Sequence, residues 1–588
     1  MGICYFSPNV NTDNEKMVRA SQEISLWNWP SRMHDLDYNR SQLREYWTIC
    51  LSIVSKYILN TKSDHANVTL ALLSQLVSVV LLFSLASRFL SEIHSLMLAL
   101  FYATMMWPYY ISIYAGHILL SQAFFLGALL CFVNGWPTGN IYTCFLSGIL
   151  ISASFFSSSA SRKYPILFVL AISLFVVNNW YGRTPDIDHL YIYIPVGFIV
   201  TTFIVLTFKG KVAAFLTRRF QLSDQYRDTA SAIGVKILVI IPLVTIMGIY
   251  VFRHYPELSA QLVSLFFGVA LVFCHIMMPR RTFFQNVKRY GLWLNVSNWA
   301  SHFDAYPEPL KTFGHKIEPG FKGGGWVWLH RLLLRMCPEI YVLWGLSIFA
   351  LFAEKITDAT LMPVSYLNLS FIVLISVCPA LIHYLTGGLR VGKAMFSCAL
   401  PMLLPVAVAV NYSVIFEAIF AFAILLQFLR TCYLLHTHLI PCRMAATNLR
   451  NMLRKHGVKQ FYTFETTFND SFTNSMLYTY PNEFEVKYVN SVSEIDVGFL
   501  VVPPTSAKSV SMETQQEAII GGDFRRDLQL DDMIESQKIE PVALEKIPTL
   551  GTSRYFAQES EVTSYLDLML GRISKQDYFR GNGWLVKI

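Results

Sequence analysis

The chain has 588 residues, of which 54% are hydrophobic and 15% are charged. A soluble domain carries about 25% charged residues, so this composition excludes an ordinary soluble enzyme and predicts a membrane protein. The formal net charge of +8 does not indicate nucleic-acid binding, because basic residues beside apolar segments report membrane orientation and anionic lipids.

The first 66 residues are polar to amphipathic, and we expect no signal peptide because residues 9–40 cannot form its apolar core. Residues 46–54 are more apolar and include Tyr46 and Trp47. This composition predicts an interfacial helix that lies along the membrane surface.

Apolar segments with the length of a transmembrane helix, about 17–25 residues, follow in succession. They predict a mainly α-helical, polytopic membrane bundle of about 11–12 spans. Two long breaks interrupt it: residues 208–233 are basic, which is typical of a cytoplasmic loop, and residues 279–338 are rich in aromatic, Gly and His residues. The predicted spans are 68–90, 93–113, 117–135, 140–158, 164–181, 188–207, 235–253, 259–278, 339–354, 362–384, 394–410 and 413–435.

After residue 440 the composition becomes that of a soluble protein. Residues 448–454 predict a helix that ends at Gly457. Residues 458–464, 484–489 and 497–502 predict three strands, so this part is expected to be a small extramembrane α/β domain. The predicted organisation is 1–66 as an extracytoplasmic acidic loop with interfacial helices, 67–278 as a first transmembrane bundle, 279–338 as a long extracytoplasmic loop, 339–440 as a second transmembrane group and 441–588 as an extracytoplasmic α/β domain.

Several short motifs occur in a fixed order along the chain. The acidic run Asp13-Asn14-Glu15 is followed by Trp29-Pro30-Ser31-Arg32, an amphipathic segment and successive spans. Later, the polar loop 383–395 precedes a helix that contains Pro401 and Pro405. This order resembles the GT-C class of integral-membrane glycosyltransferases, and within it the dolichyl-phosphate-mannose and undecaprenyl-phosphate-sugar dependent transferases. Two features depart from the class. Members begin with a transmembrane helix before the acidic loop, whereas this sequence starts almost directly at the loop, so we expect either a start further upstream or a lost first helix; and residues 114–122 lack the second acid that many members carry.

The resemblance implies an enzyme that moves a sugar from a polyprenyl-phosphate donor to a glycan, lipid or protein at the extracytoplasmic face. Such a transfer needs a base for the acceptor, which a carboxylate at the membrane face can supply. Asp13 is the expected catalytic residue and Glu15 the second candidate, with Asp35 and Asp37 as alternative acids. The competing interpretation makes Asp13 the cap of a helix that starts at Glu15.

The leaving lipid phosphate requires cationic side chains to stabilise its charge. Arg32 is the first candidate because it lies in the same segment as Asp13. The resemblance adds Arg162 and Lys163, and Arg390 and Lys393 are later candidates. Each pair could equally serve to orient the chain in the membrane.

The long loop offers side chains that could bind a sugar or acceptor. His302, Tyr306 and His315 are expected substrate-binding residues, because aromatic faces pack on sugar rings and His supplies hydrogen bonds. An interfacial aromatic belt is the alternative interpretation. The ten cysteines form no CxxC pair and the histidines lack metal-site spacing, so we expect no cofactor, and a divalent metal is unsupported.

Two other functions compete with the transferase: a transporter or flippase of a lipid-linked substrate, and a non-catalytic subunit that assembles with other membrane proteins. We expect the polyprenyl-phosphate sugar, its acceptor and the lipid bilayer as partners, and no nucleic acid. The ending Leu585-Val586-Lys587-Ile588 is not an endoplasmic-reticulum retention signal. We therefore expect a bacterial inner-membrane protein whose active face is turned toward the periplasm.

Overall fold

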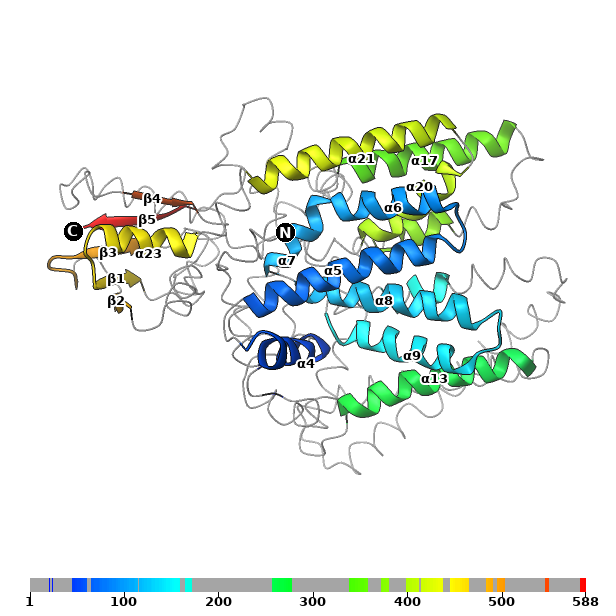
Figure 1. The fold of residues 1–588 in the computed structure, drawn as a ribbon, viewed down its shortest axis with the longest axis horizontal. Helices are drawn as coiled ribbons and strands as arrows, with labels where there is room; N and C mark the ends of the chain where they lie inside the picture. Colours follow the sequence, from blue (N-terminus) through cyan, green and yellow to red (C-terminus); the bar gives the residue numbers. More distant parts are fainter. Residues whose placement is uncertain are drawn as a thin grey trace, which may run out of the picture.

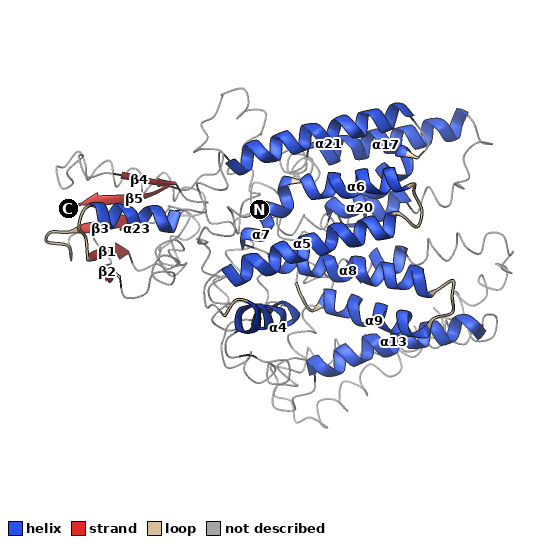
Figure 2. Ribbon diagram, viewed as in Figure 1, coloured by secondary structure: helices blue, strands red, loops and turns tan. Residues whose placement is uncertain are grey.

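The computed structural model consists of a helical bundle and a small sheet with one helix against it (Figures 1 and 2). All structural statements below concern the residues that it describes. These are residues 21, 24, 45–60, 65–114, 116–158, 164–165, 167–171, 256–277, 338–357, 372–379, 398–411, 414–436, 445–464, 483–489, 494–502, 545–548 and 582–588.

Most described elements are helices. A mainly helical chain with a small sheet agrees with the fold class that the sequence predicts. The helices are α4 (Glu45–Ile53), η1 (Val54–Ile58), α5 (His65–Ala86), α6 (Glu92–Thr104), α7 (Met106–Tyr114), α8 (Gly116–Gly135), α9 (Ile141–Phe155), α13 (Pro256–Met277), α17 (Pro338–Thr357), α20 (Ala399–Val410), α21 (Val414–Leu434) and α23 (Ala445–Lys455). The strands are β1 (Gln460–Phe464), β2 (Glu485–Val489), β3 (Phe499–Val502), β4 (Glu545–Pro548) and β5 (Asn582–Lys587).

By length and composition, three of the described helices could cross a membrane: α5, α8 and residues 414–433 of α21. Each has at least the roughly 20 residues that a hydrocarbon core of about 30 Å requires. The predicted spans 188–207 and 235–253 lie outside the described residues. The total of about 11–12 spans therefore stays a prediction.

The predicted span 93–113 is two helices, α6 and α7. Met105 separates them with an extended backbone (φ −61°, ψ 132°). Pro108 lies in the first turn of α7, where its missing N–H costs nothing, whereas inside a continuous helix its ring would clash with the preceding turn. The break leaves the last carbonyls of α6 in need of other donors.

Helix α4 runs across the bundle helices, since Figure 1 shows it nearly end-on while α5, α8 and α9 lie in the plane of the view. This is the orientation expected of a helix along a membrane surface. We call this side of the bundle the α4 end; it also holds the last turn of α6 and the start of α8. The opposite end holds the turn between α5 and α6.

Small residues allow the bundle helices to pack closely. Ser121 Oγ on α8 donates to the Ser154 carbonyl on α9 (2.6 Å), and Ser154 Oγ donates back to the Ser121 carbonyl (2.7 Å). Helices α9 and α13 meet at Gly148 and Gly268, where an added Cβ would lie 2.0 Å from Leu265 O and 2.2 Å from Phe145 O, respectively. Any larger side chain at either glycine would force the two helices apart.

The sheet has the order β2-β1-β3-β5-β4. Strand β1 is parallel to β2 and β3, whereas β5 is antiparallel to both β3 and β4. The predicted helix and three strands coincide with α23, β1, β2 and β3, and Gly457 takes the positive φ (65°) that a glycine permits after a helix. Figure 1 shows this part beyond the α4 end of the bundle.

Candidate functional site

All ten predicted site residues lie outside the described residues, so their positions stay predictions. For the N-terminal candidates and the pair Arg162 and Lys163, the nearest described residues in sequence are Ser21, Ile24, Ser158 and Tyr164. The site is therefore built from the described side chains at the α4 end. The predicted residues concerned are Asp13, Glu15, Arg32, Arg162, Lys163, His302, Tyr306, His315, Arg390 and Lys393.

The indole of Trp47 fixes α4 on the bundle. Trp47 is fully buried, and its ring meets that of His117 edge to face at 6.3 Å between centroids. It also packs on Gly116, where an added Cβ would lie 2.8 Å from Trp47 Cη2 and 2.7 Å from Ala71 Cβ. Only glycine fits at this position without displacing α4 or α5.

The N-terminal segment is attached to α4 and η1 by hydrogen bonds. Ser52 Oγ and Lys56 Nζ both donate to the carbonyl of Ile24, at 2.7 and 2.6 Å. The hydroxyls of Ser21 and Ser55 are 3.2 Å apart. The pKa of Lys56 is lowered by burial. Residues 21 and 24 therefore lie against the crosswise helix, at the same end of the bundle as Trp47.

Titratable side chains gather in the first turns of α4. The Tyr46 hydroxyl lies 3.1 Å from His275 Nδ1 on α13, and Glu45 is fully buried. Burial, followed by the charges of Cys50 and Glu45, raises the pKa of Tyr46 to about 12. At neutral pH Tyr46 is thus a neutral phenol, which can donate to Nδ1 when that nitrogen is unprotonated.

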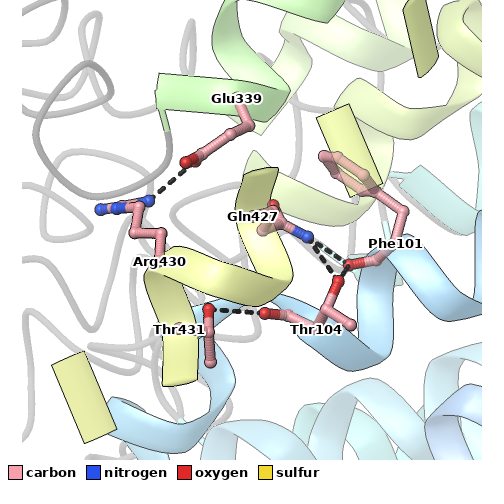
Figure 3. A network of polar contacts seen from close by, with 6 residues as sticks. All are labelled: Phe101, Thr104, Glu339, Gln427, Arg430 and Thr431. Atoms are coloured by element: carbon pink, nitrogen blue, oxygen red, sulfur yellow. Dashed lines mark hydrogen bonds and ion pairs between the residues drawn. The ribbon is translucent and has the colours of Figure 1, made fainter. Parts of the chain in front are cut away.

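A second polar network lies where α21 meets the break between α6 and α7 (Figure 3). Gln427 Nε2 donates to the carbonyl of Phe101 (2.6 Å) and to Thr104 Oγ1 (2.9 Å). Thr431 Oγ1 donates to the carbonyl of Thr104 at 2.6 Å. Side chains of α21 thereby satisfy last-turn carbonyls of α6, whose intrahelical donors end at the break.

One turn along the same face of α21, Arg430 Nη1 binds Glu339 Oε2 at 2.7 Å. The side chains are 3% and 6% exposed, so the opposite charges compensate each other away from water. Glu339 lies in the first turn of α17, where the helix dipole also favours a carboxylate. The pair joins α17 to α21.

The α4 end therefore combines a buried carboxyl, a phenol–imidazole pair and a buried ion pair at one face of an apolar bundle. Ionisable groups in such a position typically mark places where a charged or reactive molecule is handled. Sequence reasoning missed Glu45, His275, Glu339 and Arg430. An acid directly before the apolar run 46–54 was a signal for Glu45, whereas the contact between residues 46 and 275 leaves no local pattern.

Among the described residues, no group of three or more His, Cys, Asp or Glu side chains could hold a metal ion.

No family model and no curated protein matches the chain. Among solved structures, the chain is similar to ArnT from Cupriavidus metallidurans in the apo state. The two are 10% identical over 85% of this chain and 90% of that chain, with a TM-score of 0.29.

Proposed function

We propose that the chain is an integral-membrane glycosyltransferase of the GT-C kind. It takes a sugar from a polyprenyl-phosphate donor and passes it to a hydroxyl or amine of a glycan, lipid or protein acceptor. The reaction takes place at the α4 end, on the periplasmic face of a bacterial inner membrane. The observation that carries the proposal is the attachment of residue 24 to the crosswise helix α4 and η1, since α4 also carries the buried carboxyl of Glu45.

This attachment bounds where the proposed base can lie. Asp13 precedes the anchored Ser21 by eight residues, and Arg32 follows the anchored Ile24 by eight. A fully extended chain covers at most about 3.6 Å per residue, so both lie within about 29 Å of their anchors. A base and a phosphate-binding cation at the α4 end are within this reach.

Contacts on either side of them in the sequence also support Arg162 and Lys163 as phosphate-binding residues at the α4 end. The backbone N–H of Tyr46 donates to the carbonyl of Phe156 at 3.2 Å, which joins the start of α4 to the segment after α9. Lys163 directly precedes Tyr164, whose fully buried ring stacks on Phe125 of α8 at 4.7 Å between centroids. Two cations in sequence between these contacts are suited to a lipid phosphate.

The transfer needs one proton to move and one bond to be exchanged. Asp13, with Glu15 as the second candidate, takes the proton of the acceptor hydroxyl, and the oxygen attacks the anomeric carbon of the donor sugar. The bond between that carbon and the phosphate oxygen breaks, and the lipid phosphate leaves. Arg32, Arg162 and Lys163 stabilise the charge that develops on it. His302, Tyr306, His315, Arg390 and Lys393 are the proposed contacts to sugar and acceptor.

The test is donor turnover by purified protein in nanodiscs, with radiolabelled polyprenyl-phosphate sugars and mixed glycan, lipid and peptide acceptors. We expect Arg32→Ala to lower turnover by about a hundredfold, since removing a single charge-stabilising donor costs about 10²–10³ in rate. Arg19→Ala, in the same N-terminal segment, is the matched control and should leave turnover near that of the wild type. Absence of turnover with every donor, while the wild type stays folded, would favour the non-catalytic subunit.

A further inference from the structure

The bundle encloses an apolar cavity of about 360 Å³. Leu82 and Ala86 of α5, Leu98 of α6, Phe125 of α8 and Ala407 of α20 contribute to its lining. Of the lining residues that the structure describes, only Asn411 has a polar side chain. Ligand sites for polar molecules have several converging polar groups, so this lining is suited to a hydrocarbon.

A layer of polar side chains lies between this cavity and the α4 end. Gln122 Nε2 donates to the hydroxyl of Tyr102 (2.7 Å), which donates to Gln75 Oε1 (3.1 Å). These residues belong to α8, α6 and α5. On each helix the polar residue lies one to two turns nearer the α4 end than the first cavity residue, which is Phe125, Leu98 or Leu82, respectively. The cavity is thus separate from the proposed transfer site.

One side-chain nitrogen in this polar layer is buried without a hydrogen-bond partner among the described residues. Gln75 is 1% exposed, and its Nε2 has no hydrogen-bond partner among the described residues. A hydrocarbon chain offers this donor no hydrogen bond, so nothing at the layer favours extension of a chain beyond the cavity.

The cavity opens at the opposite end of the bundle. Phe89, which lines it, is 56% exposed, and Asn411 is also exposed. Phe89 belongs to the turn between α5 and α6, which Figure 1 shows at the end away from α4. From Phe125 to Val133, both on α8, the cavity covers about 12 Å at a helical rise of about 1.5 Å per residue. This depth accommodates part of a lipid chain.

Arg88 lies beside this opening, because it directly precedes Phe89 and Leu90, both of which line the cavity. Its side chain is exposed, and juxtamembrane Arg residues attract anionic headgroups by about 1 kcal/mol each. An apolar cavity with an exposed cation at its mouth matches an amphiphile with an anionic head and one chain inserted.

We propose that this cavity is a second lipid site, which holds an acyl chain of an anionic bilayer phospholipid with its headgroup beside Arg88. The site goes beyond the proposed transferase: it is separated from the α4 end by the Gln75–Tyr102–Gln122 layer and takes no part in sugar transfer. The bilayer supplies such chains at high local concentration, and an apolar cavity that excludes water gains by filling with hydrocarbon.

The test is native mass spectrometry of delipidated protein after incubation with phosphatidylglycerol, phosphatidylcholine or polyprenol. The variants Ala86→Phe and Ala407→Phe each fill the cavity from a different helix, so one can replace the other if it misfolds. Val80→Phe is the matched control on α5, because Val80 is 56% exposed and does not line the cavity. Arg88→Gln tests the headgroup contact.

We expect the wild type and Val80→Phe to retain one phosphatidylglycerol, and either cavity-filling variant to lose at least tenfold in occupancy. Arg88→Gln should reduce the preference for phosphatidylglycerol over phosphatidylcholine by about fivefold, which corresponds to about 1 kcal/mol. Equal occupancy in wild type and folded cavity-filling variants would overturn the proposal. Retention of polyprenol in preference to both phospholipids would overturn it as well.

Discussion

Arg430 on α21 and Glu339 on α17 form an ion pair of 2.7 Å, with side chains that are 3% and 6% exposed. Removing one member of a buried pair leaves an uncompensated charge, which typically costs about 3–5 kcal/mol. We therefore expect Arg430→Met and Glu339→Leu to lower the free energy of unfolding in mixed micelles by about that amount each. The double variant should lose clearly less than the sum, because it leaves neither charge buried alone.

A partly exposed pair on the same helix is the control for this prediction. Glu417 of α21 lies 3.4 Å from His94 Nε2, with side chains 37% and 17% exposed. Exposed ion pairs contribute about 0–1 kcal/mol, so Glu417→Gln should change the free energy of unfolding by no more than that. If the double variant Arg430→Met/Glu339→Leu lost as much stability as the two single variants together, Arg430 and Glu339 would act independently, which would contradict the ion pair.

Gly116 tests how α4 is held on the bundle. Gly116→Ala places a Cβ 2.7–2.8 Å from Ala71 and Trp47, so we expect a loss of about 1–3 kcal/mol from overpacking. Gly345→Ala on α17 is the control, because nothing lies within 4 Å of the added Cβ there. That change should be neutral or stabilising by up to about 1 kcal/mol, since alanine favours a helix. Thermal unfolding in detergent compares the two, and equal shifts would contradict the close contact.

Outside the helical bundle, the C-terminal sheet and α23 share an ion-pair contact that should make stability depend on pH. Burial alone would raise the pKa of Glu483, but hydrogen bonds from Arg450 and Arg454 outweigh it and lower the pKa below the ordinary value of 4.5. A carboxyl with a lowered pKa contributes stability above its unfolded pKa and loses it as the pH falls through the folded value. Stability of wild type should therefore decrease below about pH 4.5 more steeply than that of Glu483→Gln.

Circular dichroism of the full-length protein across pH 3–6 measures this difference. Glu485→Gln, on the adjacent strand β2, is the control. It should retain the wild-type profile, because Glu485 forms no ion pair with an arginine among the described residues. Parallel pH profiles for wild type and Glu483→Gln would be inconsistent with the Arg450–Glu483–Arg454 contact.

Local patterns in the sequence predicted the elements that depend on local chemistry. The expected span 117–135 coincides with α8, 413–435 with α21 and the interfacial segment 46–54 with α4. These segments are continuous apolar runs, and their length and composition suffice to identify a helix. Strand β1 and Gly457 were also predictable locally, from strand composition and from the preference for glycine after a helix.

Features that depend on distant parts of the chain were not predictable. Strand β5 pairs with β3 although 79 residues, 503–581, lie between them, so neither its register nor its place in the sheet has a local signal. The contacts Tyr46–His275 and Arg430–Glu339 likewise join remote segments. The break at Met105 was missed because the residues on both sides are equally apolar, and only Pro108 indicated it.

The central claim is that Asp13 is the base of a sugar transfer from a polyprenyl-phosphate donor. The most direct measurement is donor consumption by the purified protein in nanodiscs, with Asp13→Asn compared to Asp35→Asn and wild type. General-base catalysis contributes about 10²–10⁴ to a rate, so we predict a loss of that size in Asp13→Asn and little change in Asp35→Asn. Donor consumption by folded Asp13→Asn at the wild-type rate would contradict the claim.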